Sequence, residues 1–221
     1  YSCGFAVGNS CMVAYLNALN ADPVSAFGGV LISNATVDAA AAEALHQLFF
    51  EVLIAPAFTE DALGVLKKKK NRILLKRNAA TLPDKLYKTL LNGVISMDKD
   101  QKTEIKADLE TVTEKTPSES EIAALLFANK LVKHTKSNTI VLAANGQLFA
   151  SGVGQTSRVD ALEQAIQKAK HFGFDLNQAV MASDAFFPFP DCVEIAHKEG
   201  IRAVIQPGGS IKDKASIDFC N

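Results

Sequence analysis

The sequence lacks an excess of either charge, because 23 Lys and Arg residues stand against 24 Asp and Glu residues, a formal net charge of −1. A near-neutral chain offers no general electrostatic attraction to nucleic acid or to an acidic membrane surface. Long apolar runs are missing too, since the existing ones are broken by Gly, Ser or Asn, so we expect no membrane span. The N-terminus has no basic region followed by an apolar one, so no secretory signal is expected.

Familiar metal and nucleotide motifs are also missing. The spacing of the four cysteines matches no zinc or redox motif, which favours free thiols in a cytosolic protein: Cys3, Cys11, Cys192 and Cys220. A zinc deaminase would need a Pro-Cys-x-x-Cys pair besides its His-x-Glu, and that cysteine pair is absent. The sequence contains neither a Walker lysine loop nor G-x-G-x-x-G.

An aromatic loop is predicted at residues 181–191, MASDAFFPFPD. Pro188 and Pro190 exclude a helix interior or a central strand, yet the segment carries three phenylalanines between Asp184 and Asp191. A large apolar patch normally covers something, and flat ring walls beside fixed carboxylates suit a planar, polar ligand. The alternative, in which the rings only plug the domain core, stays open from the sequence.

The first half alternates helix and strand patterns. Apolar spacing and caps predict helices over 10–20, 38–50 and 59–66, and short buried strands over 30–32, 52–55 and 72–76. The polar stretch 82–108 is predicted as a strand or hairpin outside the core. A linker at 111–117 is the expected internal boundary.

The second half repeats this order. Ser118 and Glu121 form a predicted capping box, and Asn145-Gly146 is a strong hairpin signal. Helices are predicted over 118–134, 157–172 and 191–199, with strands over 139–144, 147–154, 179–183 and 202–209. Both halves are therefore predicted as layered αβα units with a hairpin edge and parallel crossovers.

Several strand ends carry candidate binding residues. The turn at 152–160, GVGQTSRVD, joins two glycines to Arg158, and backbone N–H groups at a helix start attract anions. The turn at 206–213, QPGGSIKD, offers similar chemistry with Ser210. Asn138, before a strand, can supply one acceptor and two donors. For the first turn, a capped helix with a surface Arg is the alternative.

Other features of the first half have two interpretations each. Gly28 and Gly29 precede a buried strand and either let a ligand approach the backbone or only make a turn. Glu51 abuts a buried strand and either binds a ligand or is exposed at the end of that strand. The lysines 67–70 suit a helix C-terminus and leave a weak nucleic-acid hypothesis.

Seven motifs, in order, resemble the transformylase region of the AICAR transformylase/IMP cyclohydrolase family. They are CGFAVG, DPVSAFGGVLIS, FFEVLIAPAF, KSNTIVLA, GVGQTSRVDAL, MASDAFFPFPD and AVIQPGGSIKD. The resemblance spans essentially the whole chain. It implies an α/β fold of tandem cytidine-deaminase-like αβα repeats, each a three-layer sandwich without metal, at residues 1–116 and 117–221.

The resemblance implies formyl transfer from 10-formyltetrahydrofolate to AICAR, a purine-pathway ribotide, in a cytoplasmic homodimer with active sites at the interface. It implies no catalytic metal, no nucleic acid partner and no membrane. By similarity, the AICAR site would be lined by Gly28, Glu51, Asn138, Arg158 and Phe186. The folate would face Val159, Asp191, Ser210 and Ile211. Catalytic roles would fall to Asn138 and Asp191, whereas family members often carry Asp in place of Glu51.

Two departures from the family pattern bear on activity. The family's catalytic Lys-His pair would precede Cys3, and its C-terminal Arg-x-Phe/His element would follow Asn221. The cyclohydrolase domain is absent as well. We therefore expect the 221-residue chain to have little or no transformylase activity, in contrast to its parent protein. The alternative is a non-catalytic ligand-binding or dimerisation module that keeps the fold.

Overall fold

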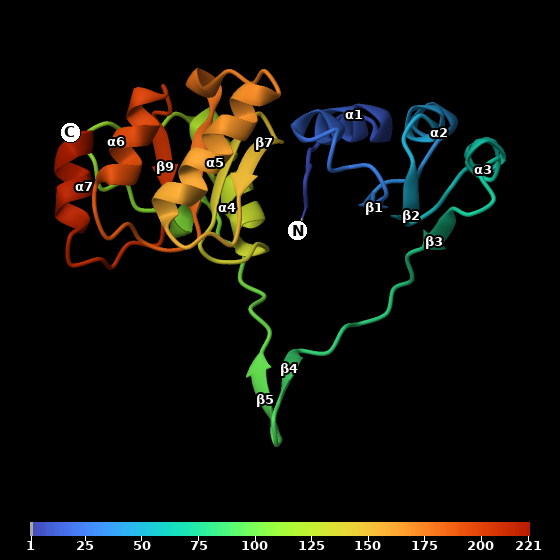
Figure 1. Ribbon diagram of the computed structural model, residues 1–221, viewed down its shortest axis with the longest axis horizontal. Coiled ribbons are helices and arrows are strands. Elements are labelled where there is room, and N and C mark those ends of the chain that lie inside the picture. The colour runs from blue at the N-terminus through green and yellow to red at the C-terminus, as the bar shows by residue number, and fades with distance from the viewer. Residues whose placement is uncertain (1) are drawn as a thin grey trace.

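The computed structural model describes residues 2–221, and Tyr1 lies outside the described residues. Within that range the chain is an α/β protein whose strands form a three-stranded, a two-stranded and a four-stranded sheet. The first and third sheets lie at opposite ends of the long axis, and the two-stranded ribbon projects away from both (Figure 1). No helix in this range is long and apolar enough to cross a membrane.

The first sheet is parallel, with the order β1 (Gly29–Ile32), β2 (Phe50–Ala55), β3 (Ile73–Lys76). Its helices are α1 (Cys11–Ala21), α2 (Ala39–His46) and α3 (Glu60–Leu66). Each begins after a side chain that accepts a first-turn N–H, which satisfies an otherwise unpaired donor. The helix predicted over 38–50 is too long, because buried Phe50 opens β2 instead.

The three helices pack on one face of this sheet. Leu31, Leu53 and Leu74 pair across the strands and join the core under the helices. On the opposite face, apolar side chains of β1 and β3 are from 46% to 70% exposed: Val30, Ile32, Ile73 and Leu75. Within residues 2–221 this half therefore has two layers rather than the three that the resemblance implies, because no described segment covers the second face.

The ribbon is an antiparallel hairpin of β4 (Lys85–Leu90) and β5 (Gly93–Asp98). All of its residues are exposed, which confirms the prediction of a hairpin outside the core.

The second sheet has the order β7 (Gln147–Gly152), β6 (Ile140–Ala144), β8 (Val180–Ser183), β9 (Ala203–Ile205). Only β8 and β9 run parallel. One core lies between the sheet and α4 (Glu119–Lys133), and another lies against α5 (Arg158–His171) and α6 (Asp191–Lys198). This half thus has helix, sheet and helix layers, and β6 and β8 are buried throughout.

The end of the chain departs from the predicted pattern. The strand predicted over 202–209 is only Ala203–Ile205, and residues 206–212 form a loop before α7 (Asp213–Cys220). Positive φ angles at Gly208 and Gly209 end the strand, because extended backbone requires negative φ.

The two halves are joined at the outer edge of β7. The backbone N–H of Val7 donates to Gly146 O at 2.8 Å, and Leu148 N–H donates to Phe5 O at 2.8 Å. Gln147 Nε2 also donates to the carbonyl of Asn17 in α1 at 2.7 Å. Chain from the first half thus extends the second sheet, and the division at residues 116 and 117 stays a prediction.

Candidate functional site

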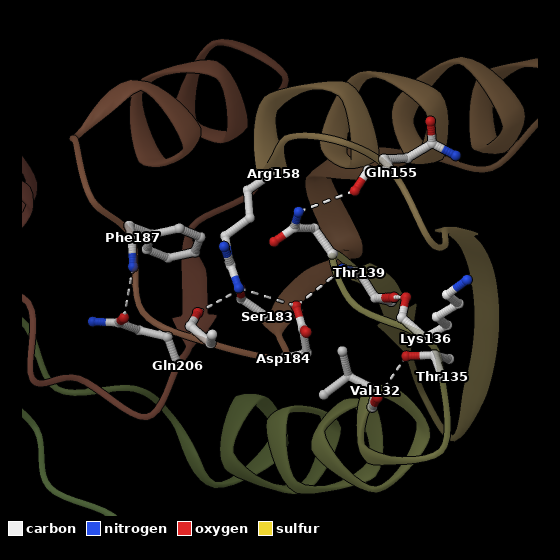
Figure 2. A network of polar contacts seen from close by, with 12 residues as sticks. Val132, Thr135, Lys136, Thr139, Gln155, Arg158, Ser183, Asp184, Phe187 and Gln206 are labelled. Carbon is white, nitrogen blue, oxygen red and sulfur yellow. Dashed lines mark hydrogen bonds and ion pairs between the residues drawn. The ribbon is translucent and has the colours of Figure 1, made fainter. Parts of the chain in front are cut away.

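The candidate site lies at the edge of the four-stranded sheet that is formed by the ends of its strands, not along an outermost strand. Because β6 is antiparallel to both β7 and β8, the start of β6 adjoins the ends of its two neighbours. This topology brings Asn138, Arg158 and Asp184 to the same edge, from segments far apart in the sequence. Figure 2 shows Arg158 reaching across this edge toward Asp184, next to Ser183 and Thr139.

Arg158 is held by a largely buried carboxylate. Its Nη2 lies 3.5 Å from Asp184 Oδ1, and the two side chains are only 16% and 15% exposed. Asp184 Oδ1 also accepts the Thr139 N–H at 2.9 Å. Arg158 Nε is buried without a hydrogen-bond partner among residues 2–221. An oriented guanidinium with unused donors is suited to a polar or anionic ligand.

Asn138 is oriented just as firmly, by the turn that precedes α5. Its Nδ2 donates to the carbonyls of Gln155 at 3.0 Å and Thr156 at 3.1 Å. Its backbone exchanges hydrogen bonds with Gln155 in both directions, and the Ser137–Asn138 peptide bond is cis. Both amide hydrogens are thereby engaged, so Oδ1 is the side-chain atom left to accept a hydrogen bond from a ligand.

The start of α5 combines both interpretations of its turn. Ser157 caps the helix by accepting the Asp160 N–H at 3.0 Å, and the Asp160 carboxylate accepts a hydrogen bond from Thr156 Oγ1. The Asp160 carboxylate puts a negative charge in the first turn, where it opposes an incoming anion. The Arg158 side chain, however, is largely buried rather than at the surface. It is therefore the group of this turn that could bind a ligand.

The aromatic loop divides its phenylalanines between the two predicted roles. Phe187 is 1% exposed within the core under α5 and α6, and its N–H donates to Gln206 Oε1 at 3.1 Å (Figure 2). Phe186 and Phe189 remain 43% and 49% exposed. One ring therefore anchors the loop, and the two others are left with surface that a ligand can contact.

Asp191 is the first residue of α6, and its Oδ1 accepts the N–H of Cys192 at 2.8 Å. Burial, with a further effect from the Asp191 carboxylate, raises the pKa of Cys192 to about 12. The thiol stays protonated at neutral pH and is no nucleophile.

The second glycine turn has two of its N–H donors already satisfied within the chain. The N–H groups of Gly209 and Ser210 both donate to Asp213 Oδ2, at 2.7 and 3.0 Å. Ile211, beside them, is fully exposed. An internal carboxylate thus takes the place that the sequence suggested for a bound anion, and the half-buried Ser210 hydroxyl accepts the Lys212 N–H at 3.1 Å.

Gly28 and Glu51 lie at the other sheet. Gly28 has φ +73° and donates its N–H to Phe49 O at 2.9 Å. The turn therefore requires glycine at this position. Glu51 is exposed in β2, next to the Gly29 and Phe50 pair. The structure brings these two residues close to each other but places them on a different sheet from Asn138 and Arg158.

Sequence reasoning missed several residues that shape the site. The sequence predicts Asp184 as one of two carboxylates beside the aromatic loop but not as the partner of Arg158, and it predicts no role for Thr139, Gln155, Gln206 or Asp213. All five are polar residues at or just beyond the ends of strands or turns, where side chains of neighbouring strands converge. This position was the sequence signal that could have identified them. Within residues 2–221, no three His, Cys, Asp or Glu side chains form a metal-binding cluster.

Comparison with known proteins matches residues 1–168 to a family model described as AICARFT/IMPCHase bienzyme. Three relatives, all named bifunctional purine biosynthesis protein PurH, are similar over nearly the whole chain. The protein of Bacteroides thetaiotaomicron is 63% identical over 220 residues, 100% of this chain and 43% of its own length. Those of Aquifex aeolicus and Caldicellulosiruptor saccharolyticus are 49% and 48% identical, over 99% of this chain and 43% and 42% of theirs. The chain thus spans less than half the length of these relatives.

Proposed function

Because the chain belongs to the AICARFT/IMPCHase bienzyme family, we propose that it contributes to an AICAR formyltransferase site. The reaction would join the formyl carbon of 10-formyltetrahydrofolate to the exocyclic amine of AICAR. The bond from that carbon to the folate nitrogen breaks, and the proton lost by the amine balances the one gained by tetrahydrofolate. The observation that carries the proposal is the oriented, largely buried Arg158 beside Asn138, each with unused hydrogen-bonding capacity.

The amine of AICAR is a weak nucleophile, because the imidazole ring and the carboxamide withdraw its lone pair. Positioning both reactants is therefore expected to supply much of the acceleration. Arg158 would anchor polar groups of the ribotide. Asn138 Oδ1 would accept a hydrogen bond from the carboxamide or amine and would steady the charge that develops there.

The exposed face of Phe186 would stack on the imidazole ring, a contact that requires the partial exposure observed for this side chain. Asp191 would hold the folate head group and assist proton transfer, with Val159, Ser210 and Ile211 beside the same molecule. Asp191 and Ser210 each follow a strand end of the four-stranded sheet, which supports this placement.

Gly28 and Glu51 would line the AICAR site from the other sheet. We place these two residues with Asn138 in a site at the interface of a homodimer, because one chain keeps them on separate sheets. The proposal includes the tandem cytidine-deaminase-like repeats at residues 1–116 and 117–221, a cytoplasmic location and, for the parent protein, an additional IMP cyclohydrolase activity.

The test is formyl transfer by the parent protein, measured as tetrahydrofolate formed from AICAR and 10-formyltetrahydrofolate. Arg158→Ala is expected to lower kcat/KM at least a hundredfold. Arg202→Ala, which removes an exposed arginine elsewhere in the same half, is the matched control and should stay within twofold. Arg158→Lys keeps the charge but loses the planar fork, and should fall between the two.

Calorimetric titration of AICAR separates this function from the alternative of a non-catalytic module. A parent protein that binds AICAR but transfers no formyl group would be a binding module. Absence of both binding and transfer would overturn the proposal, as would an Arg158→Ala variant that remains folded and keeps full activity.

A further inference from the structure

An ion pair between a buried carboxylate and a partly exposed lysine joins the two halves of the chain, away from the residues assigned to the site. Asp22, just after α1, is 2% exposed, and Lys168 Nζ in α5 lies 2.5 Å from its Oδ2. The contact is an ion pair rather than a well-directed hydrogen bond. The other oxygen, Oδ1, accepts the Ser25 N–H at 2.8 Å.

Stability alone is a poor reason for such a pair. Removing a carboxylate and an ammonium from water is costly, and well-packed apolar residues often stabilise a protein as much or more. Burial raises the pKa of Asp22, but the Lys168 ammonium and the Ser25 N–H outweigh burial and hold the pKa below its usual value. The pair is therefore charged at neutral pH. Unlike two apolar groups, two opposite charges give each side chain one specific partner.

The pair lines a cleft of about 430 Å³ together with Gln155 and Gln164. Gln164 lies one turn before Lys168 on α5, and its Oε1 accepts from Gln155 Nε2 at 3.2 Å. The backbone of Gln155 in turn holds Asn138 in both directions. These contacts, joined by the turn of α5 between Gln164 and Lys168, thus link Asp22 to Asn138.

Both ends of this series reach residues of the proposed site. The turn that starts at Asp22 is closed by Ser25 and Ala26, whose N–H groups donate to the side chain and the carbonyl of Asp22, and it ends at Gly28. On the other side, α5 begins at Arg158, about 15 Å along the helix axis from Lys168. A rigid helix transmits a fixed position at one end to the other.

We propose that Asp22 and Lys168 are positioning residues for formyl transfer. Their pair fixes α5 against the turn that ends at Gly28, and thereby the placement of Arg158 and Asn138 in one site and of Gly28 in the site across the homodimer interface. This role rests on the function proposed above. It adds two residues that touch neither substrate and act only through the geometry of the site.

The test uses the parent protein with Lys168→Met, which keeps the length of the side chain and removes its charge. Lys170→Met is the matched control, because Lys170 lies on the same helix and pairs with Glu199 at the surface. Lys168→Met is expected to lower kcat/KM at least tenfold, mainly by raising KM for AICAR. Lys170→Met should stay within twofold, and Lys168→Arg should recover much of the loss.

A second variant separates positioning from folding. Lys168→Met leaves a buried charge unpaired and should lower the thermal midpoint, so kinetics are measured well below that midpoint. Adding Asp22→Asn removes the unpaired charge but keeps the acceptor for the Ser25 N–H. This double variant should regain much of the thermal midpoint without regaining KM for AICAR.

Each outcome decides the question. Recovery of both stability and KM in the double variant would show a merely structural pair and overturn the positioning role. Equal kinetics for Lys168→Met and Lys170→Met would also overturn it, with the proposed function intact. A parent protein without formyl-transfer activity would overturn the proposed function, and the positioning role with it.

Discussion

Replacing Phe187 with alanine should destabilise the second half of the chain far more than the same change at Phe186. Phe187 is 1% exposed in a well-packed core, whereas Phe186 is 43% exposed. A lost ring of roughly 100 Å³ costs about 2.4 kcal/mol in cavity energy at ~24 cal/mol per Å³, and the lost transfer free energy adds about 2 kcal/mol. We expect about 4 kcal/mol for Phe187→Ala and at most about 1 kcal/mol for Phe186→Ala.

Urea unfolding followed by far-ultraviolet circular dichroism measures this difference, since the chain has no tryptophan to report by fluorescence. Phe189→Ala is the control for an exposed ring of the same loop, 49% exposed with Lys212 Nζ 4.3 Å from its centroid. Similar losses at all three positions, or less than about 1 kcal/mol at Phe187, would refute the assignment of Phe187 as the anchor.

The same variants should rank in the opposite order for ligand binding. Stacking of a heteroaromatic ring on an aromatic side chain is worth about 1–3 kcal/mol, so Phe186→Ala should weaken AICAR binding about fivefold or more. Phe187→Ala should affect the affinity of the folded fraction less, because its buried ring offers no surface to a ligand. Calorimetry on the folded variants gives this comparison, and an unchanged affinity for Phe186→Ala would argue against stacking.

Three further predictions concern packing, capping and pH. Gly152→Ala should destabilise the protein by more than about 2 kcal/mol in urea unfolding, because a Cβ there would overlap a backbone carbonyl of α5. In the control Gly64→Ala the added Cβ meets no neighbour, so this change should be neutral or stabilising. Ser118→Ala should cost about 1 kcal/mol by the same assay, since it removes the capping box of α4; no change would show that the box is dispensable. The pKa of Asp22 in the folded state is below its usual value of 3.8. The stability that the pair with Lys168 contributes should therefore be full above pH 3.8 and should be lost as the pH falls through the folded-state pKa. Acid titration of the unfolding free energy should therefore show a smaller loss for Asp22→Asn than for the unaltered protein, and equal losses would contradict this.

Local signals were sufficient for most elements. The Ser118 and Glu121 side chains form the predicted reciprocal cap, and Asn145 and Gly146 adopt the positive φ angles that a two-residue hairpin turn requires. Thr59 caps α3 as predicted. These features depend on residues within one turn of each other, so a short stretch of sequence contains all the interacting groups.

Local signals failed where two segments competed for the same role. Residues 47–50 could extend α2 by propensity, but Phe50 gains more by burial in β2 against β1. The glycine turn after β9 has the donors of an anion site, but the Asp213 carboxylate four residues beyond Gly209 satisfies them. A propensity or motif describes what a segment can do alone. It does not include the distant or neighbouring residue that contacts the segment in the folded chain.

The sequence by itself determined the family, the alternation of helices and strands, the caps and turns, and the residue types available for the proposed site. Only the tertiary structure decided which phenylalanine is buried, that Arg158 is held by Asp184, and that Asp22 meets Lys168 across the two halves. The physical reason is range: caps and turns are set by contacts between neighbours in the chain. Burial and ion pairing depend instead on which distant segments the packed sheets bring into contact.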